Sequence, residues 1–342
     1  EEYKDETLYF EDTAFSVIPI HFRNWKLDQN DLEKIEIVGT GASARVYKGV
    51  MKESGNQVAI KQLKPKELKG SKFRSFQREV SILAMVDHPT ILKFFGATDT
   101  FPYSIVTEWM DGGDLYKALK KHKLDGTQLT ICALDIARGM NYLHQKMIVH
   151  RDLKSLNILL DKDGHSRICD LGFARVVEET SKDNLKTFVG TYYWMAPELL
   201  GEDLSYTPKV DVYSYGIMLW EMLAQKVPYN GEDPTKVIAK VYQNNARPIF
   251  PSDVDKVPGM KKLIEDCWER EPENRPSFKE IIERFARGDA YYQNADVDKV
   301  LEYARKVLAE DDPDSLKTKN FIDECEKTPV TLEKFNETFQ NM

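Results

Sequence analysis

The chain has 342 residues, of which 42% are hydrophobic and 30% are charged, and its formal net charge is −8 with histidine neutral. This composition is that of a globular protein and excludes wholesale disorder and collagen-like structure. At roughly 100 to 200 residues per domain, the length predicts two domains or one two-lobed domain. Mild acidity argues against nucleic acid as a partner. No stretch without Asp, Glu, Lys or Arg approaches the roughly 18 residues of a membrane helix, so we expect no membrane span.

The four cysteines lie far apart in the sequence, and none belongs to a C-x-x-C pair. No histidine cluster at metal-ligand spacing accompanies them. Zinc binding and a disulfide framework are therefore disfavoured, and this cysteine usage fits a reducing compartment. We expect the protein to be cytoplasmic.

The hydrophobic pattern changes along the chain and predicts an α+β fold. Residues 1–31 mix acidic with aromatic side chains without a clear period, which indicates an N-terminal extension. Between residues 32 and 107, short apolar runs separated by glycine and charged turns predict strands, and one helix interrupts them, because Phe76, Val80 and Leu83 recur at helical spacing. After Gly113 the period is mainly helical. A small β-rich lobe therefore precedes a larger α-rich one.

A third zone, residues 288–342, has a composition of its own. Apolar residues between 297 and 308 recur at helical spacing and predict one helix, and those between 332 and 339 hint at a shorter one. We interpret this zone as a helical C-terminal extension. Its apolar stripe is moderate in length, which favours packing on the lobes over binding of a partner.

A glycine-rich loop lies between two of the predicted strands. It does not join a strand to a helix, which argues against a dinucleotide-binding fold. Glycines let a hairpin turn approach phosphates closely and expose backbone N–H donors, so the loop suits a lid over a nucleotide. Taken alone, an ordinary glycine hairpin is the better interpretation. The loop residues are Gly39, Thr40, Gly41, Ala42, Ser43 and Ala44.

A lysine and a glutamate strengthen the nucleotide interpretation. Lys61 lies on an apolar strand, and Glu79 lies on the helix that interrupts the strands. A lysine in an apolar setting needs a partner, and Glu79 can hold its ammonium so that it points at phosphates. The alternative, a surface ion pair, contributes little. Together with the glycine loop, the pair favours nucleotide binding.

The motifs that decide the function follow in order: HRDLKSLN at residues 150–157, DLG at 170–172 and APE at 196–198. With Asp211 in DVYSYG and Arg275 in RPSF, the sequence here resembles the eukaryotic protein kinases over residues 32–287. The resemblance implies a bilobal protein kinase fold. Its N-lobe would span residues 32–107, its hinge 108–113 and its C-lobe 114–287.

The resemblance assigns the catalytic residues, and phosphoryl-transfer chemistry explains them. Asp152 would orient the attacking hydroxyl and accept its proton, and Lys154 would contact the transferred phosphate. Lys61, held by Glu79, would neutralise phosphate charge. Such a reaction depends on positioning and charge neutralisation more than on covalent catalysis.

The same resemblance implies ATP and a divalent metal. Asn157 and Asp170 offer the hard oxygen ligands that Mg²⁺ prefers, with Mn²⁺ as an alternative. Besides these two, Lys61 and the glycine loop, the implied nucleotide-binding residues include a small gatekeeper, two hinge residues, a ribose contact and three apolar contacts to adenine. Thr107 would be the gatekeeper, Glu108 and Met110 the hinge residues, and Asp114 the ribose contact. The apolar contacts to adenine would be Val46, Ala59 and Leu159.

Structural expectations also follow from the resemblance. Glu198 would pair with Arg275 and hold the substrate-side loop to the helical lobe. An apolar spine would couple the N-lobe helix to the active site through Leu83, Phe94, His150 and Leu171. Two positions depart from the commonest family pattern, Ala44 in place of a glycine and Leu171 in place of phenylalanine. Neither removes a ligand.

The choice of substrate hydroxyl follows from finer resemblance. Lys154, with Gly190 and Thr191, resembles Ser/Thr kinases, whereas YYWMAPE and DVYSYG look like the tyrosine-kinase-like branch that includes the Raf and mixed-lineage kinases. Dual specificity stays open as an alternative. Arg151 beside Asp152 suggests regulation by a phosphate on the activation segment. The candidate phosphosites are Thr187, and then Thr180 and Ser181.

We therefore expect a protein Ser/Thr kinase that acts in signalling. Its expected partners are ATP, protein substrates and an upstream kinase. The rival interpretation is a pseudokinase scaffold that keeps the fold but signals through contacts. Retention of Lys61, Glu79, Asp152, Asn157 and Asp170 argues against it. A metabolic small-molecule kinase is disfavoured further, because it has no need of the loop that would cradle a peptide.

Overall fold

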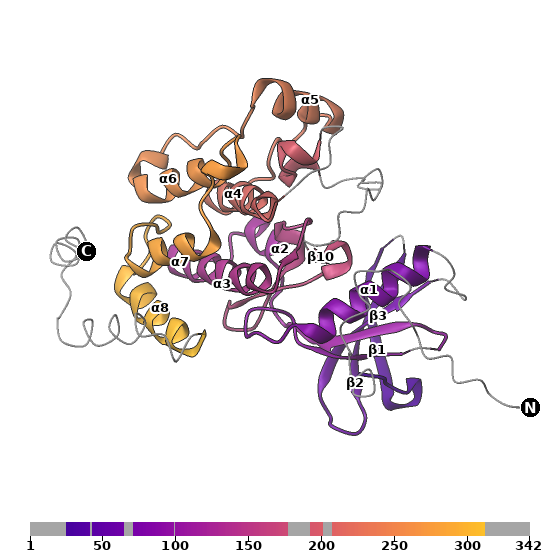
Figure 1. Cartoon of the computed structure of the whole chain (residues 1–342). Helices are drawn as coiled ribbons and strands as arrows, with labels where there is room; N and C mark the ends of the chain where they lie inside the picture. The colour runs from indigo at the N-terminus through magenta and orange to yellow at the C-terminus, as the bar shows by residue number, and fades with distance from the viewer. Residues whose placement is uncertain are drawn as a thin grey trace, which may run out of the picture.

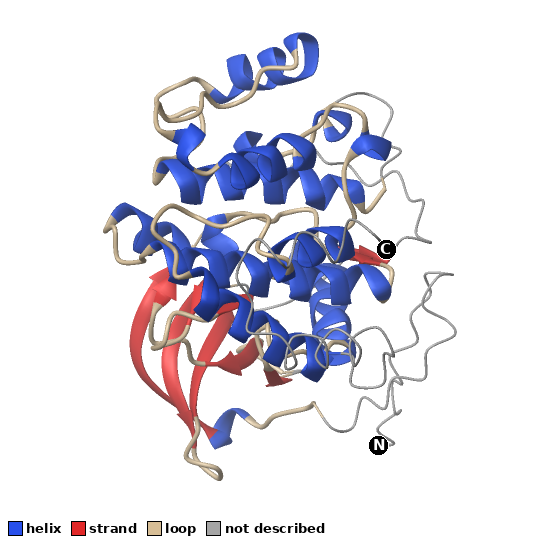
Figure 2. Cartoon of the chain, turned by 90° about the vertical axis from the view of Figure 1, so that its left-hand side faces the viewer, coloured by secondary structure: helices blue, strands red, loops and turns tan. Residues whose placement is uncertain are grey.

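The computed structural model describes residues 25–41, 43–64, 71–98, 100–176, 192–200 and 207–311. They form two lobes, a β-sheet with one helix and a larger helical part, as predicted (Figure 1). Figure 2 shows the strands gathered at one end of the molecule and most of the helices beyond them. Within the described ranges, no helix is both long and apolar enough to cross a membrane.

The N-lobe sheet is antiparallel and has the strand order β1-β2-β3-β5-β4. Because side chains alternate along a strand, the two faces of β3 differ. Val58 and Ile60 are buried in a small core with Val106, whereas Ala59 and Lys61 face the other way. The strands are β1 (Leu32–Thr40), β2 (Ala44–Met51), β3 (Gln57–Leu63), β4 (Phe94–Ala97) and β5 (Ser104–Glu108).

Residues 25–31, which precede the predicted domain boundary at residue 32, lie against this sheet. The backbone N–H of Leu27 donates to Ala97 O (2.9 Å), and the N–H of Ala97 donates to Trp25 O (2.8 Å). The side-chain amide of Gln29 donates to Thr98 Oγ1 at 2.8 Å. These residues therefore belong structurally to the N-lobe. Pairing of this kind uses backbone groups, so it leaves no alternating side-chain pattern in the sequence.

Helix α1 (Ser71–Met85) covers the sheet on the side toward the C-lobe. The stripe that predicted it is buried at Phe76, Val80 and Leu83. After α1 the chain makes a turn over residues 86–93 before β4 begins. Within this turn, the N–H of Leu92 donates to Ile168 O at 2.9 Å, so the turn is bonded to the C-lobe.

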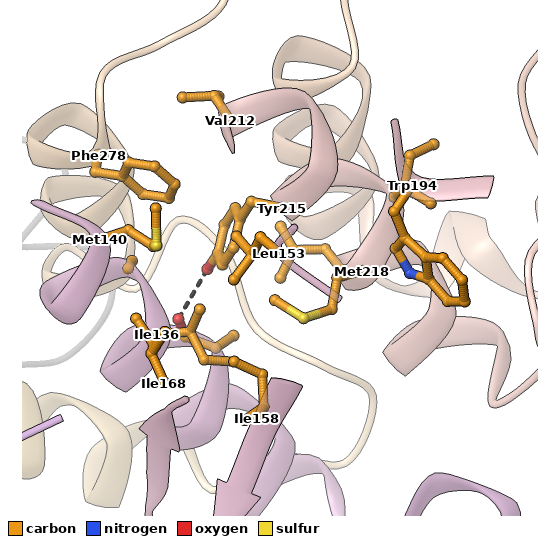
Figure 3. Close-up of a cluster of buried hydrophobic side chains, with 14 of the residues drawn as sticks. Ile136, Met140, Leu153, Ile158, Ile168, Trp194, Val212, Tyr215, Met218 and Phe278 are labelled. Atoms are coloured by element: carbon orange, nitrogen blue, oxygen red, sulfur yellow. Dashed lines mark hydrogen bonds between the residues drawn. The ribbon is translucent and has the colours of Figure 1, made fainter. Parts of the chain in front are cut away.

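The C-lobe is built around α4, which is buried on nearly all sides. Figure 3 shows Tyr215 of α4 among core side chains, and its hydroxyl donates to Ala133 O on α3 at 2.8 Å. An apolar helix with one satisfied hydroxyl is what a central core position requires. The helices are α2 (Leu115–Lys120), α3 (Gly126–Gln145), α4 (Lys209–Ala224), α5 (Pro234–Asn244), α6 (Pro258–Cys267) and α7 (Phe278–Ala286).

Short strands carry the loops between the lobes. Strand β6 (Gly113–Asp114) pairs with β8 (Ile158–Leu160), which pairs with β9 (Ser166–Ile168). Strand β7 (Ile148–Val149) pairs with β10 (Arg175–Val176). The start of the loop from β7 to β8 therefore lies beside the end of the turn from β9 to β10, and the end of that loop lies beside the start of the turn.

The helix expected between residues 297 and 308 is present as α8 (Val297–Asp311). Its buried residues Val300, Leu301, Ala304 and Val307 face α3 and α7. Ahead of it, the buried Tyr292 donates its hydroxyl to Leu219 O at 3.1 Å. Residues 289–311 thus pack on the C-lobe, as the sequence favoured. The shorter helix expected at 332–339 lies outside the described residues.

Replacing Leu301 by alanine tests this packing. Leu301 is 6% exposed, so Leu301→Ala should lower the free energy of unfolding by about 2 to 5 kcal/mol, because it removes buried methyl groups and leaves a cavity. The neighbouring exposed residue gives the control, since Glu302→Ala should change the free energy of unfolding by no more than about 0.5 kcal/mol. Urea titration measures both. Equal stabilities would contradict burial of α8.

Candidate active site

Lys61 on β3 contacts one carboxylate of the N-lobe and one of the C-lobe. Its Nζ lies 2.6 Å from Glu79 Oε1 on α1 and 3.3 Å from Asp170 Oδ1. Burial alone would lower the pKa of Lys61, but the charges of the two carboxylates outweigh burial and raise it. The ammonium therefore stays charged. The pair expected from the sequence is present, and Asp170 joins it.

Asp170 follows β9 and has a left-handed backbone, with φ 60° and ψ 66°. This conformation is uncommon for a residue with a Cβ and is typical of functional turns. The charge of Lys61 lowers the pKa of Asp170 despite partial burial. Its side chain is 38% exposed. A Cβ at Gly172 would come within 3.3 Å of the Asp170 and Glu79 carboxylates, so glycine permits this close approach.

The loop after β7 brings three predicted residues together. Lys154 Nζ donates to both carboxylate oxygens of Asp152, at 2.8 and 3.0 Å. Asn157 Nδ2 donates to the backbone O of Asp152 at 2.8 Å and to its Oδ2 at 2.9 Å. Asp152 is 3% exposed. The carboxylate is thus held in one orientation beside a fixed ammonium.

A buried carboxylate on α4 fixes the backbone of this loop. Asp211 accepts the N–H of His150 at 2.9 Å and that of Arg151 at 2.8 Å, and His144 Nε2 lies 2.9 Å away. Arg151 has a φ of 63°, again left-handed. Burial would raise the pKa of Asp211, but the hydrogen bonds and charges of the histidines hold it below its ordinary value. Asp211 therefore stays ionised and stabilises the strained backbone.

Two of the three apolar contacts proposed for adenine, Val46 and Ala59, lie on one face of the N-lobe sheet, and the third, Leu159, lies on β8 in another sheet. In the sheet register, Val46 lies opposite Lys61, and Ala59 lies opposite Thr107, so these side chains point to the same side. Val46, Ala59 and Leu159 are half-buried, whereas the residues next to them in β3 and β8 are buried. The sheet therefore presents apolar carbon beside the ammonium of Lys61.

The hinge residues and the glycine loop lie on either side of this face. The N–H of Glu108 donates to Lys93 O at 2.9 Å, and Met110 is buried. Gly39 and Thr40 end β1, and Ala44 begins β2. Between them the N–H of Gly41 donates to Ala44 O at 2.9 Å, which makes a tight hairpin. Ser43 is exposed in this turn, and Ala42 lies outside the described residues.

Asp114 has a structural role that we did not predict from the sequence. Its Oδ1 accepts the N–H of Lys117 at 2.8 Å and caps helix α2, while its Oδ2 lies 2.8 Å from Lys117 Nζ. Its expected contact with a ribose stays a prediction. The signal was available, because an aspartate directly before an apolar helical pattern is a typical N-cap.

One further ion pair and the expected apolar spine are present. Arg275 makes the expected bidentate pair with Glu198, at 2.6 and 2.9 Å. The expected spine residues Leu83, His150 and Leu171 are buried, and Phe94 packs partly buried on the same core. The candidate phosphosites Thr180, Ser181 and Thr187 lie outside the described residues.

Glu221 is a functional candidate that sequence reasoning missed. It lies on α4, is 2% exposed, and accepts hydrogen bonds from Ser155 Oγ (2.7 Å) and from Trp194 Nε1 (3.0 Å). It therefore joins the loop of Asp152 to the segment before the APE motif. Burial raises the pKa of Glu221 to about 7, against the effect of both hydrogen bonds. Its only signal in the sequence is an acid in the last two turns of an otherwise largely apolar helix.

Glu221 should make stability depend on pH. Its pKa in the folded state is raised above the unfolded value, so its contribution is fully present below about pH 4.5 and is lost as the pH rises through about 7. Glu221→Gln removes this dependence and can keep both hydrogen bonds. The free energy of unfolding of the variant relative to wild type should rise by roughly 2 to 3 kcal/mol between pH 5 and pH 8. Chemical denaturation at each pH measures both free energies of unfolding. A difference between Glu221→Gln and wild type that stays constant with pH would contradict a raised pKa.

Comparison with known proteins identifies this arrangement. The model of the protein kinase domain matches residues 32–285. The chain is 39% identical over 262 residues to serine/threonine-protein kinase STY17 of Arabidopsis thaliana, covering 76% of this chain and 45% of that protein.

Two other relatives extend the comparison. Serine/threonine/tyrosine-protein kinase HT1 of Arabidopsis thaliana is 36% identical, with 75% of this chain and 66% of that protein covered. Serine/threonine-protein kinase TNNI3K of Homo sapiens is 36% identical, with 78% and 32% covered. The chain thus spans less than two thirds of each of these relatives. It belongs to the protein kinase domain family, in the tyrosine-kinase-like group of Ser/Thr kinases.

Proposed function

We propose that this chain transfers the γ-phosphoryl group of ATP to serine and threonine hydroxyls of protein substrates. The observation that carries the proposal is the position of the Lys61 ammonium between Glu79 and Asp170, beside the apolar face of the N-lobe sheet. A partly exposed cation next to an apolar surface suits a ligand that has a flat base and a phosphate tail. The names of the relatives support serine and threonine as acceptors.

The residues of the loop after β7 would position the acceptor. Asp152 is ionisable, buried and held by Asn157, so its carboxylate can orient a hydroxyl and accept its proton. Lys154 lies beside it and would contact the phosphoryl group as charge moves to its oxygens. The two groups are prearranged, so little reorganisation is needed at the moment of transfer.

The oxygen donors nearby fit a divalent cation, for which we propose Mg²⁺, with Mn²⁺ as an alternative. The Nδ2 of Asn157 is used on Asp152, which leaves its Oδ1 as the acceptor, and the Asp170 carboxylate is partly exposed. Such a cation takes few protein ligands and completes its shell with waters and phosphate oxygens. When bound, it neutralises phosphate charge.

Regulation and setting are part of the proposal. Arg151 Nε donates to Phe173 O at 2.8 Å, close to the start of the activation segment. We propose that phosphate on Thr187, or on Thr180 or Ser181, pairs with basic groups there, and that an upstream kinase adds it. We also propose a signalling role in the cytoplasm.

Mapping of phosphosites tests the activity. The full chain is incubated with ATP and Mg²⁺, or with ATP and Mn²⁺, with and without a generic protein substrate, beside Asp170→Asn and the exposed control Asp163→Asn. We expect phosphoserine and phosphothreonine in wild type and in Asp163→Asn, and at least a 100-fold loss in Asp170→Asn, because a metal ligand is removed.

The other outcomes separate the alternatives. Phosphotyrosine that depends on Asp170 would indicate dual specificity. Nucleotide binding without transfer, even after treatment with an upstream kinase, would indicate a pseudokinase scaffold.

A second prediction concerns the activation segment. Thr187→Ala should lower the activity towards an external substrate by about 10-fold or more, because the phosphate that would pair with Arg151 is lost. Thr187→Ser should keep it, since serine accepts the same modification. Full activity in Thr187→Ala would remove Thr187 as the main site and leave Thr180 and Ser181 for the same measurement.

A further inference from the structure

Helix α8 ends beside the turn that follows α1. The carboxylate of Asp311, in its last turn, accepts two hydrogen bonds from Arg138 on α3, from Nε at 2.6 Å and from Nη2 at 2.8 Å. Its Oδ1 also lies 3.2 Å from His88 Nε2 in the turn at 86–93. The side chains of Arg138 and His88 are 2% and 8% exposed, and that of Asp311 is 20% exposed. Figure 1 shows α8 next to α3.

Arg138 depends on this helix for its partners. Its Nη1 donates to Asp135 Oδ1 at 3.0 Å, and the hydroxyl of Tyr303 donates to the same oxygen at 2.6 Å. Tyr303 also stacks on His165, with ring centroids 5.1 Å apart. Tyr303 and Asp311 are two helical turns apart and therefore lie on one face of α8. A buried guanidinium thus receives one carboxylate from its own helix and one from α8, and each is held in place.

His88 transmits the contact into its turn. Its Nδ1 accepts the backbone N–H of Thr90 at 3.2 Å and lies 3.0 Å from Thr90 Oγ1. An accepting Nδ1 places the proton on Nε2, which then donates to Asp311; this tautomer is assigned from the bonding pattern. Tyr142 stacks on His88, with centroids 4.9 Å apart, and its hydroxyl accepts the N–H of Asp87 at 3.0 Å.

The same turn is bonded to the strand that leads to Asp170. The N–H of Ile168 donates to Thr90 O at 2.8 Å, and the N–H of Leu92 donates to Ile168 O at 2.9 Å. In the other direction, the turn continues α1, which carries Glu79. Thr90 also lies close to α3, because a Cβ at Gly139 would come within 2.6 Å of its Oγ1. The turn therefore joins the two carboxylates that hold Lys61.

We propose that Asp311 is a positioning residue for phosphoryl transfer. By bonding Arg138 and His88 together, it fixes the turn at 86–93 and, through that turn, the placement of Glu79 and Asp170 around Lys61. Helix α8 is then an activating brace supplied by the segment that follows the family's domain. The effect on catalysis rests on the proposed kinase function. The effect on the turn does not.

The test uses the full chain with Asp311→Asn, which keeps the shape and removes the charge. The matched control is Glu310→Gln, an exposed acid one residue earlier. A third variant, His88→Asn, keeps an acceptor near the N–H of Thr90 and loses the bond to Asp311. For each we measure kcat and KM for ATP well below the lowest Tm, together with hydrogen–deuterium exchange over residues 75–93.

We expect Asp311→Asn to lower kcat/KM for ATP by roughly 5-fold or more, the scale of coupling between distant sites. Exchange over residues 75–93 should become faster, while Glu310→Gln matches wild type. His88→Asn should change both quantities in the same direction. The double variant should be no worse than Asp311→Asn alone, because that substitution already weakens the contact with His88. Should Asp311→Asn fail to fold, His88→Asn decides by itself.

Several results would overturn the proposal. A lower Tm with unchanged kcat/KM and unchanged exchange over residues 75–93 would make Asp311 a purely structural residue. Additive losses in the double variant would show that its effect does not pass through His88. If the wild type transfers no phosphate, the proposed function fails, and the exchange data still decide whether Asp311 holds the turn.

Discussion

The ammonium of Lys61 is the point on which the arrangement of the two lobes depends. It lies on a strand of the N-lobe, and its two carboxylates come from α1 and from the turn after β9 in the C-lobe. The Lys61 side chain is only partly exposed, so its charge depends on the two carboxylates as well as on water. Any movement of α1 away from the sheet would leave it with one partner. The ion pairs of Lys61 therefore depend on how the two lobes are placed.

Helix α4 supplies the corresponding fixed point in the C-lobe. One of its acids, Asp211, accepts hydrogen bonds from backbone N–H groups of the loop after β7. Another, Glu221, accepts hydrogen bonds from side chains of that loop and of the segment before the APE motif. Both acids lie within an otherwise apolar helix at the centre of the core. Both segments are thus bonded to the buried centre of the C-lobe.

The sequence predicted the residues of the candidate site better than the contacts that hold those residues in place. Lys61, Glu79, Asp152 and Asp170 were assigned by their place in motifs that resemble those of the protein kinases, and phosphoryl-transfer chemistry explains why each group is there. The α+β class followed from the change in hydrophobic period. The capping of α2 by Asp114 was readable but overlooked. The contact between Arg138 and Asp311 joins residues 173 positions apart, and no local pattern specifies it. Contacts of this kind depend on tertiary packing, which one sequence does not display.

The packing of residues 25–31 and 289–311 also changes what counts as a unit of this molecule. The family's domain ends at residue 285, yet Tyr292, Ala304 and Val307 are buried in the same core as the helices before them. Surface that stays buried in the native state contributes to a single cooperative transition. We therefore expect residues 25–31 and 289–311 to unfold together with residues 32–285, as one cooperative unit that is larger than the matched domain. Residues 25–31 and 289–311 contribute to its stability although they lie outside the matched domain.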